Sequence, residues 1–405
     1  MDDSHAVVVG GGIGGLSAAL ALHRHGWRVT VLERAAELRE VGAGLSLMAN
    51  AVRGLDALGL GPALRDGGHG EAPGGIRDRH GRWLSRVDAT EMVRQLGTTA
   101  LGVHRATLHR TLREALPASS LHTDATVEHV EPGPDHAEVR YHGPDGPHTL
   151  RADLVVGADG LRSRVRAQLW PRHPGPVYAG STAWRAAIAF PDPAPAAITW
   201  GPGAEFGMVP IGDGQLYWYA ALNAPPGGHA LDELAALRER FGDWHDPIPA
   251  LMAATPPGVV LRNDIHHLAV PLPTYVRGRV ALLGDAAHAM TPNLGQAPGR
   301  PSRTRWCWAP SARPVPPRCP PRWPRTTSSA DHGARALPGP PSPPAVSASN
   351  CATRSPSRYG TRRCASPRPG PPCGAWPATR TGDPRWAEPA PRQGGRWPSR
   401  RTRVR

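Results

Sequence analysis

The sequence predicts an α/β protein of Rossmann-like topology, with an inserted antiparallel sheet and a disordered or non-native C-terminal tail. Three observations predict this fold class. A strand, a glycine-rich turn, a helix and a second strand follow one another over residues 5–34. Strand-like segments cluster between residues 173 and 270, and the composition changes abruptly after Gln296.

The strand–helix–strand unit stands at the start of the chain. "HAVVVG" is a short apolar strand, "LSAALALHRHG" has helical spacing with a glycine stop, and "WRVTVLER" is a second strand. Gly10, Gly12 and Gly15 form G-x-G-x-x-G, in which missing side chains permit a tight turn and close approach of backbone N–H groups to a pyrophosphate. Glu33 ends the second strand, where an acid accepts hydrogen bonds from an adenosine ribose. The unit predicts a dinucleotide site; a glycine-rich packing turn is the alternative.

Two later segments have related patterns. Residues 152–166, "ADLVVGADGLRSRVR", form a buried strand that ends at Asp159-Gly160 and enters a basic helix; we call them the DG segment. Residues 278–292, "GRVALLGDAAHAMTP", form another buried strand that ends at Gly284-Asp285 beside a helix; we call them the GD segment. A carboxylate at the end of an apolar strand needs a partner, so Asp285 is a candidate ligand-binding residue.

The three segments, in this order and at this spacing, resemble the fingerprint of the class A flavoprotein monooxygenases, the family of p-hydroxybenzoate and salicylate hydroxylases. The resemblance covers Val7 to Gln296. It implies a Rossmann-like FAD-binding domain, FAD as cofactor and NAD(P)H as co-substrate. It also implies that O2 forms a flavin C4a-hydroperoxide, which transfers one oxygen to a small aromatic or similarly electron-rich substrate.

The resemblance implies FAD contacts for particular residues. It assigns the pyrophosphate to Gly10, Gly12 and Gly15, and the adenosine to Glu33, Arg34 and Val127. It assigns the flavin to Arg105, Asp285, Pro292 and Gly295. Asp159 is the residue that would link FAD binding to NAD(P)H binding. Arg105 suits either the pyrophosphate or the flavin edge. Two of these residues have simpler interpretations, Arg105 as a surface helix charge and Asp159 as a turn former or helix cap.

The middle of the chain predicts a substrate-binding sheet. "YAGSTAWRAAIAF", "AEFGMVPI" and "QLYWYAAL" are strand-like, and a "GDG" turn joins the last two. On the third strand Tyr217 and Tyr219 point one way and Trp218 the other. Four residues are pocket candidates or ordinary sheet residues: Tyr217, Met208, Trp184 and Arg185. The sequence identifies no catalytic residue, and His288 is interpreted as a structural helix residue.

These assignments divide the chain. We expect residues 1–172 to form the first part of the FAD-binding domain, with substrate-side elements near 60–100. Residues 173–270 form the substrate-binding sheet, residues 271–296 return to the FAD-binding domain, and residues 297–405 are an Arg/Pro-rich tail.

The tail carries the chain's basic charge. The 405 residues have a net charge of +14, and five cysteines. Residues 1–296 contain 26 arginines and 30 acidic residues, whereas residues 297–405 contain 21 arginines, 3 acidic residues and every cysteine. The tail has four residues of the Val, Leu, Ile, Met and Phe types, so it cannot build a core.

The favoured explanation of this composition is a frameshift, and a genuine basic, disordered extension is the alternative. The chain has no lysine and 47 arginines, as expected of a gene rich in G and C, in which shifted reading frames remain open. One permitted spelling of "APGRPSRTRWCWA", with a single G restored after Gln296, encodes "GAGQAIEDAVVLG", and Trp306-Cys307-Trp308-Ala309 forces Val-Leu-Gly in that frame. The recovered string has the pattern of an amphipathic helix and resembles the family's next helix. We therefore expect this chain to bind FAD weakly or not at all.

Other functional classes find less support. A flavin-dependent reductase or dehydrogenase of the same fold would share every nucleotide motif. A nucleic-acid binder would depend on the basic tail alone, whose tryptophans and arginines show no regular spacing. A halogenase is disfavoured because no lysine is present. We expect no nucleic acid, no membrane partner, no metal and a cytoplasmic location; substrate identity and oligomeric state are not predicted.

Overall fold

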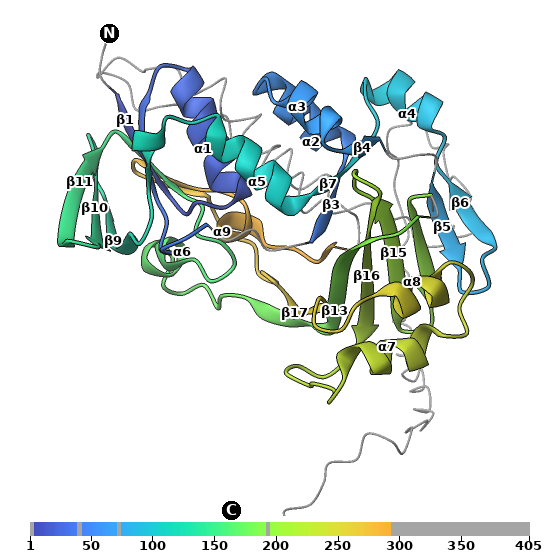
Figure 1. The fold of residues 1–405 in the computed structure, drawn as a ribbon. Coiled ribbons are helices and arrows are strands. Elements are labelled where there is room, and N and C mark those ends of the chain that lie inside the picture. The colour runs from blue at the N-terminus through green and yellow to red at the C-terminus, as the bar shows by residue number, and fades with distance from the viewer. Residues whose placement is uncertain (1–3, 39–42, 71–73, 192–194, 293–405) are drawn as a thin grey trace, which may run out of the picture. The chain divides into compact units, whose positions relative to one another are not determined.

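The computed structural model describes residues 4–38, 43–70, 74–191 and 195–292, all within one compact unit of the chain (Figure 1). A six-stranded sheet forms its nucleotide-binding half. Its strands are, in spatial order, β18 (Val276–Arg277), β19 (Val280–Leu282), β12 (Leu154–Gly157), β1 (His5–Val9), β2 (Arg28–Leu32) and β8 (Leu121–His122). All neighbours are parallel except β18 and β19.

Strand β1 is apolar throughout because both of its faces are covered. Ala6 and Val8 share a core with the helices α1 (Ile13–Arg24), α2 (Ala49–Ala57), α3 (Gly61–Asp66) and α5 (Arg105–Glu114). Val7 and Val9 belong to a second core with β9 (Thr126–Pro132), β10 (Ala137–Gly143), β11 (Gly146–Ala152), α6 (Arg164–Leu169) and α9 (Asp285–His288). The carboxyl end of β1, where the glycine turn begins, is thus held from both sides.

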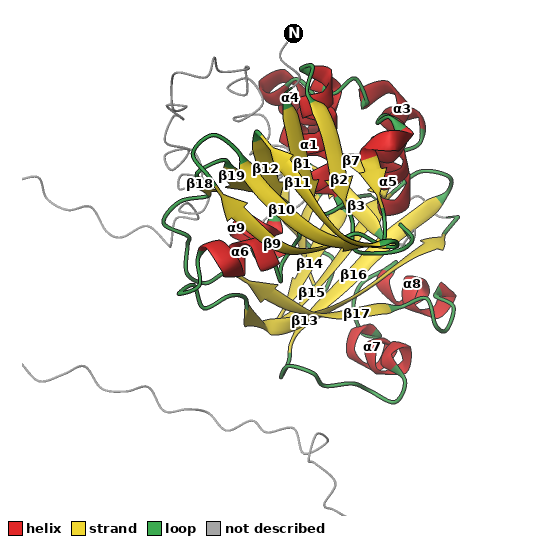
Figure 2. Ribbon diagram, turned by 90° about the vertical axis from the view of Figure 1, so that its left-hand side faces the viewer, coloured by secondary structure: helices red, strands yellow, loops and turns green. Residues whose placement is uncertain are grey.

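A seven-stranded sheet forms the other half (Figure 2). Its strands are, in spatial order, β17 (Leu261–His267), β13 (Val177–Ala189), β16 (Gln215–Asn223), β15 (Ala204–Pro210), β14 (Ala197–Gly201), β5 (Gly75–Asp78) and β6 (Trp83–Arg86). Neighbours are antiparallel except β14 and β5, which are parallel. Helices α7 (Glu233–Phe241) and α8 (Ile248–Ala254) cover one face, where Phe206 and Trp218 stack with ring centroids 5.6 Å apart.

A small sheet lies against the other face. It contains β3 (Gly44–Leu47), β7 (Leu101–His104) and β4 (His69–Gly70), in the order β3-β7-β4. A Cβ at Gly44 would come within 2.2 Å of the Tyr217 Cβ, and one at Gly102 within 1.9 Å of the Pro210 carbonyl oxygen. Glycine at both positions therefore permits close contact between the sheets. The remaining elements are α4 (Ala89–Leu96) and the 3-10 turn Ala118–Ser120.

The predicted fold class is confirmed in the described residues. The Rossmann-like unit is β1-α1-β2, and the three strand-like segments are β13, β15 and β16, with the "GDG" turn between the last two. Residues 297–405 lie outside the described residues. Within the described ranges, no helix combines the length and apolarity that a membrane span requires.

Candidate active site

The glycine turn, residues 10–15, connects β1 to α1. Gly10 has a φ of +106°, and a Cβ there would lie 2.5 Å from the carbonyl oxygen of Ala158. A Cβ at Gly15 would lie 1.9 Å from the carbonyl oxygen of Gly10. Gly12 differs, because a Cβ there would meet nothing within 4 Å, and no side chain caps the helix that follows it. Two glycines are thus required by packing, and the third faces open space.

Glu33 is held directly beside this turn. Its Oε2 accepts a 2.7 Å hydrogen bond from the Gly11 N–H, and its Oε1 accepts one of 2.9 Å from the Ala35 N–H. The Ala125 N–H donates to the Glu33 carbonyl, which brings the start of β9 next to the end of β2. Val127 lies two residues further, buried, beside an irregularity in the pairing of β9 with β10. Arg34 is exposed.

The peptide carbonyl of the turn is held by α5. The His109 ring donates through Nε2 to the Gly11 carbonyl oxygen at 2.7 Å. The backbone of Gly11 is therefore fixed at both of its polar groups, by Glu33 at the N–H and by His109 at the C=O. Sequence reasoning did not identify His109, which is 98 residues from Gly11 and has no motif of its own.

The DG and GD segments are joined by Arg166. This buried side chain donates through Nη1 to the Ala286 carbonyl at 3.0 Å and through Nη2 to the Leu161 carbonyl at 2.6 Å. Burial lowers the pKa of its guanidinium. Asp159 accepts from the N–H groups of Arg164 and Val165 with one oxygen, as in the helix-cap interpretation. Its other oxygen is buried without a hydrogen-bond partner among the described residues.

Asp285 opens the short helix α9. Its side chain retains an exposed surface, yet the surrounding protein desolvates the carboxyl enough to raise its pKa above the ordinary value. Pro292, the last described residue, is exposed, and Gly295 lies outside the described residues. His288 packs its ring against Tyr275, with centroids 5.9 Å apart.

The register of the seven-stranded sheet separates the four pocket candidates. Trp184 pairs with Ala220, and Met208 with Trp218, so both lie on the face covered by α7 and α8, in its core. Arg185 and Tyr217 lie on the opposite face, toward β3. The structure therefore brings Arg185 and Tyr217 together and leaves Trp184 and Met208 with the helices.

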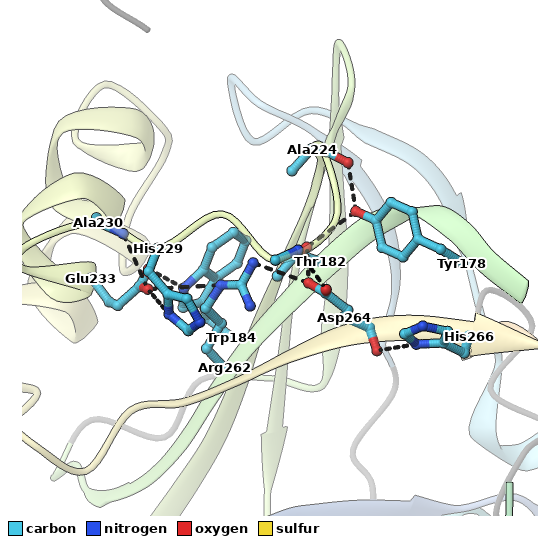
Figure 3. A network of polar contacts seen from close by, with 11 residues as sticks. Tyr178, Thr182, Trp184, Ala224, His229, Ala230, Glu233, Arg262, Asp264 and His266 are labelled. Atoms are coloured by element: carbon cyan, nitrogen blue, oxygen red, sulfur yellow. Dashed lines mark hydrogen bonds and ion pairs between the residues drawn. The ribbon is translucent and has the colours of Figure 1, made fainter. Parts of the chain in front are cut away.

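Trp184 is held in place by a network at the sheet edge (Figure 3). Its Nε1 donates to Glu233 Oε2 at 2.7 Å, and the Arg262 guanidinium lies 5.7 Å from the centre of its ring. Arg262 Nη2 reaches Asp264 Oδ1 at 3.0 Å, and that oxygen also accepts from the Thr182 hydroxyl. The network ties β13 and β17 to α7, which is a structural role for Trp184.

The opposite face presents two tyrosines between a cation and an acid. Tyr217 and Tyr219 lie with ring centroids 6.1 Å apart; the first interacts electrostatically with Arg185 and the second with Glu205. Glu205 also accepts from Trp200 Nε1 at 3.1 Å. We call this set the polar row: Arg185, Tyr217, Tyr219 and Glu205.

Both tyrosine hydroxyls in the polar row are held protonated. Burial raises the pKa of Tyr217, and the positive charge of Arg185 only partly opposes this effect. Burial raises the pKa of Tyr219 well above its usual range, and the negative charge of Glu205 adds to the rise. The two hydroxyls are therefore hydrogen-bond donors throughout the neutral pH range.

Two arginines interact electrostatically at the cationic end of the row. Arg105, at the start of α5, is partly buried, and desolvation together with the charge of Arg185 lowers its pKa. Arg185 donates through Nη2 to the Asn263 amide oxygen, while its buried Nε has no hydrogen-bond partner among the described residues. An unused buried donor beside a second cation favours an oxygen-bearing ligand at this position.

Three contributors to this arrangement escaped the sequence analysis: Arg166, Glu205 and Asn263. Their contacts depend on which strands pair and in which register, which no local pattern specifies. Glu205 had one usable signal, because it stands two residues before Gly207 in an otherwise apolar strand.

Comparison with known proteins identifies the class. Residues 3–222, more than half of the chain, match the FAD binding domain family. The chain belongs to this family, and by homology it is a class A FAD-dependent monooxygenase.

Particular relatives place it more closely. The chain is 42% identical over 295 residues to the aurachin C monooxygenase/isomerase of Stigmatella aurantiaca, covering 72% of this chain and 76% of that protein. It is 32% identical over 298 residues to an FAD-dependent urate hydroxylase of Klebsiella pneumoniae, covering 72% and 77%. The crystal structure of Klebsiella pneumoniae HpxO complexed with FAD and uric acid has a TM-score of 0.70 and 29% identity, covering 77% of this chain and 80% of that one. The cofactor of the homologous structures is FAD, and NAD(P)H is the family's typical reductant.

Proposed function

We propose that the fold serves FAD- and NAD(P)H-dependent insertion of one oxygen atom into a small aromatic or similarly electron-rich ring. One observation carries the proposal. Arg105 and His109 stand one turn apart on α5, which is about 6 Å along the helix axis. The charge of the first interacts with that of Arg185 in the polar row, and the second contacts the Gly11 carbonyl. A single helix therefore connects the glycine turn to the tyrosine-bearing face of the sheet.

The residues present fit FAD at the turn. Gly12 offers open space in front of an uncapped helix start, and the backbone N–H groups there suit a pyrophosphate. Glu33 has one backbone donor on each carboxylate oxygen and can accept further hydrogen bonds from a ribose, with exposed Arg34 and the backbone of Val127 for the adenine. The acidic Asp285 suits the ribityl hydroxyls, and Pro292 is the described residue that the resemblance assigns to the ring. Bound FAD supplies the reductive activation of O2.

The chain's own residues then act on the substrate. Arg185 and the Tyr217 hydroxyl can hold a phenolic or enolic oxygen, and the cation favours its ionised form. The close contact at Gly44 limits water on the tyrosine face. We assign Trp184 and Met208 to the sheet core rather than to the pocket, and Asp159 to the coupling of FAD and NAD(P)H binding, since one of its oxygens has no hydrogen-bond partner among the described residues.

We further propose that the composition break after Gln296 is a frameshift that impairs FAD binding. The relative that is 42% identical to this chain aligns with it over 295 residues, and 296 residues precede the break. The lost segment would follow the GD segment directly and would supply a helix beside the flavin. Without it, apolar surface of the FAD-binding domain loses its cover.

The test compares the chain as written with a restored chain, in which one G is inserted after the Gln296 codon. We expect the restored chain to retain stoichiometric FAD through gel filtration and to consume O2 with NAD(P)H and a phenolic or heteroaromatic substrate, yielding a hydroxylated product. The chain as written should lose its FAD. Tightly held, stoichiometric FAD in the chain as written would contradict the impairment. NAD(P)H oxidation by the restored chain with no oxygenated product would favour the reductase alternative.

A further inference from the structure

The hairpin of β5 and β6 carries two arginines and a tryptophan on one face of the seven-stranded sheet. Arg77 on β5 pairs with Trp83 on β6, and Gly75 pairs with Arg86. Positions 83 and 86 are separated by an odd number of residues, so a regular strand would point their side chains to opposite faces. The pairing is irregular here and skips Leu84, and this bulge brings Trp83 and Arg86 to the same face as Arg77.

Both guanidinium groups lie against the Trp83 ring. Their central carbon atoms are 4.0 Å from the ring centre for Arg77 and 4.8 Å for Arg86. The Trp83 ring packs against the core that the sheet shares with α7 and α8, so it is a fixed support for both cations. The two arginines occupy diagonal positions of the hairpin, with Cα atoms about 8 Å apart, and Gly75 places no side chain at the remaining corner.

The positive charges of Arg77 and Arg86 are not compensated within the described part of the chain, where neither forms an ion pair. The acids nearest to them in the sequence are used elsewhere: Asp78 pairs with Arg82 at 2.7 Å, and Asp88 caps α4. The buried Nε–H of Arg77 has no hydrogen-bond partner among the described residues. Burial and the charge of Arg86 both lower the pKa of Arg77, as expected of two cations that are held together at a cost in free energy.

We propose that Arg77 and Arg86 form a binding site for a doubly charged, phosphate-type oxyanion at the edge of the seven-stranded sheet. An oxyanion between the two guanidinium groups replaces their repulsion by charge-assisted hydrogen bonds. A phosphate group matches both positive charges, whereas a carboxylate neutralises only one. Free phosphate and the phosphate ester of a larger molecule share this chemistry.

This site is separate from the glycine turn and from the polar row. Arg77 pairs with Thr199 of β14, which pairs with Phe206 in the core under the helices α7 and α8. The polar row lies on the opposite face of the sheet, and β6 is the last strand of that sheet (Figure 1). The inference therefore goes beyond the proposed function and does not depend on it.

The test measures the binding of inorganic phosphate to the chain as written by isothermal titration calorimetry at pH 8, where most phosphate is doubly charged. Sodium chloride holds the ionic strength constant, so that general screening does not contribute to the difference between samples. We expect Arg86→Gln to weaken phosphate binding about tenfold, because charge-assisted hydrogen bonds are lost. Acetate should bind to the unmodified chain about tenfold more weakly than phosphate, because its single charge matches only one arginine.

Three further variants separate the site from general effects of charge. Arg77→Gln should weaken phosphate binding as Arg86→Gln does, and thermal unfolding checks that each variant is folded. Because Arg86 is exposed, Arg86→Gln decides the question even if Arg77→Gln does not fold. Arg86→Lys retains the charge and should bind phosphate more tightly than Arg86→Gln. Arg94→Gln, an exposed arginine on α4 that pairs with Glu91, is the matched control and should leave the affinity unchanged.

Phenyl phosphate distinguishes the two sources of the oxyanion. Tighter binding of phenyl phosphate than of inorganic phosphate supports an ester of a larger molecule, and equal or weaker binding supports free phosphate. Both results require the loss of affinity in Arg86→Gln.

The inference would be overturned by the absence of phosphate binding, or by equal phosphate affinity in Arg86→Gln and the unmodified chain, which would assign the binding to another place such as the glycine turn. Equal affinities for acetate and phosphate would also contradict it, as would an equal loss in Arg94→Gln. Hydroxylation by the restored chain is measured separately. The proposed function and this inference therefore fail independently of each other.

Discussion

The glycine turn and the polar row are built for ligand recognition in opposite ways. The turn works through absent side chains: Gly10 and Gly15 bring backbone within contact distance, and Gly12 leaves space. The polar row works through four side chains on three strands, whose identities set charge and hydrogen-bond polarity. A site made of backbone tolerates no added atoms, whereas a site made of side chains can change its ligand without changing the fold. We therefore expect substitutions of Gly10 and Gly15 to affect folding, and substitutions in the row to affect selectivity.

The largest effect should come from Gly15→Ala. Its Cβ would overlap the Gly10 carbonyl oxygen at 1.9 Å, so the turn must move, and the free energy of unfolding should fall by about 3 kcal/mol. Gly12→Ala is the matched control in the same turn, with nothing within 4 Å and a φ of −73°. It should change stability by less than about 1 kcal/mol while weakening FAD binding by the restored chain. Urea unfolding and flavin fluorescence titration measure the two quantities; equal stability losses would show that the glycines do not differ in role.

The next effect should be the loss of the His109 contact. His109→Leu leaves the Gly11 carbonyl without its 2.7 Å donor and should weaken FAD binding by the restored chain about tenfold, near 1.4 kcal/mol. His109→Gln can still donate from its amide and should recover most of that affinity. Similar FAD affinities for the Leu and Gln variants would mean that His109 acts by packing alone.

Tyr219→Phe should have a smaller effect on stability and a distinct dependence on pH. Removing the hydroxyl leaves Glu205 with the Trp200 donor and should cost about 1 kcal/mol at neutral pH. The raised pKa adds a second signature. Above pH 10 an unfolded tyrosine releases a proton that folded Tyr219 keeps, so stability falls as pH rises from about 10 toward the folded pKa. Urea unfolding between pH 9 and 11 measures how steeply the free energy of unfolding falls with pH. In Tyr219→Phe this slope should be smaller by the equivalent of about one proton; an unchanged slope would assign the titration to other groups.

The smallest effect should be a gain at Asp285. Because desolvation raises the pKa of this carboxyl, the folded state holds its proton more tightly than the unfolded state, and stability falls as pH rises from 3.8 through the folded pKa. Asp285→Asn removes that charge and should slightly stabilise the FAD-free chain at pH 7, while weakening FAD binding by the restored chain. A loss of stability on this substitution would indicate that the carboxylate has a stabilising partner.

The same contrast explains what the sequence could predict. The turn, its strand and its helix are contiguous, and apolar periodicity with three glycines defines them. The sheet strands were also predictable, but the pair Trp184-Arg185 could not serve one pocket, because adjacent strand residues point to opposite faces. Met208 shares a face with Trp218 only through the pairing of β15 with β16. His109 meets Gly11 across 98 residues, and such contacts follow from packing rather than from local pattern.

The parallel pairing of β5 with β14 has a consequence for how the chain folds. Gly75 pairs with Ala197, and Ile76 with Ile198. The seven-stranded sheet therefore contains a strand that precedes its neighbour β14 by more than a hundred residues in the sequence. Closing a loop of that length is slow and delays completion of the sheet until its later strands have been synthesised. An excised fragment 173–270 would lack β5 and β6 and present β14 as a bare edge, inviting pairing with other chains. The order of the sequence suggests that residues 173–270 are a separable module. We expect this fragment to aggregate when it is released by proteolysis.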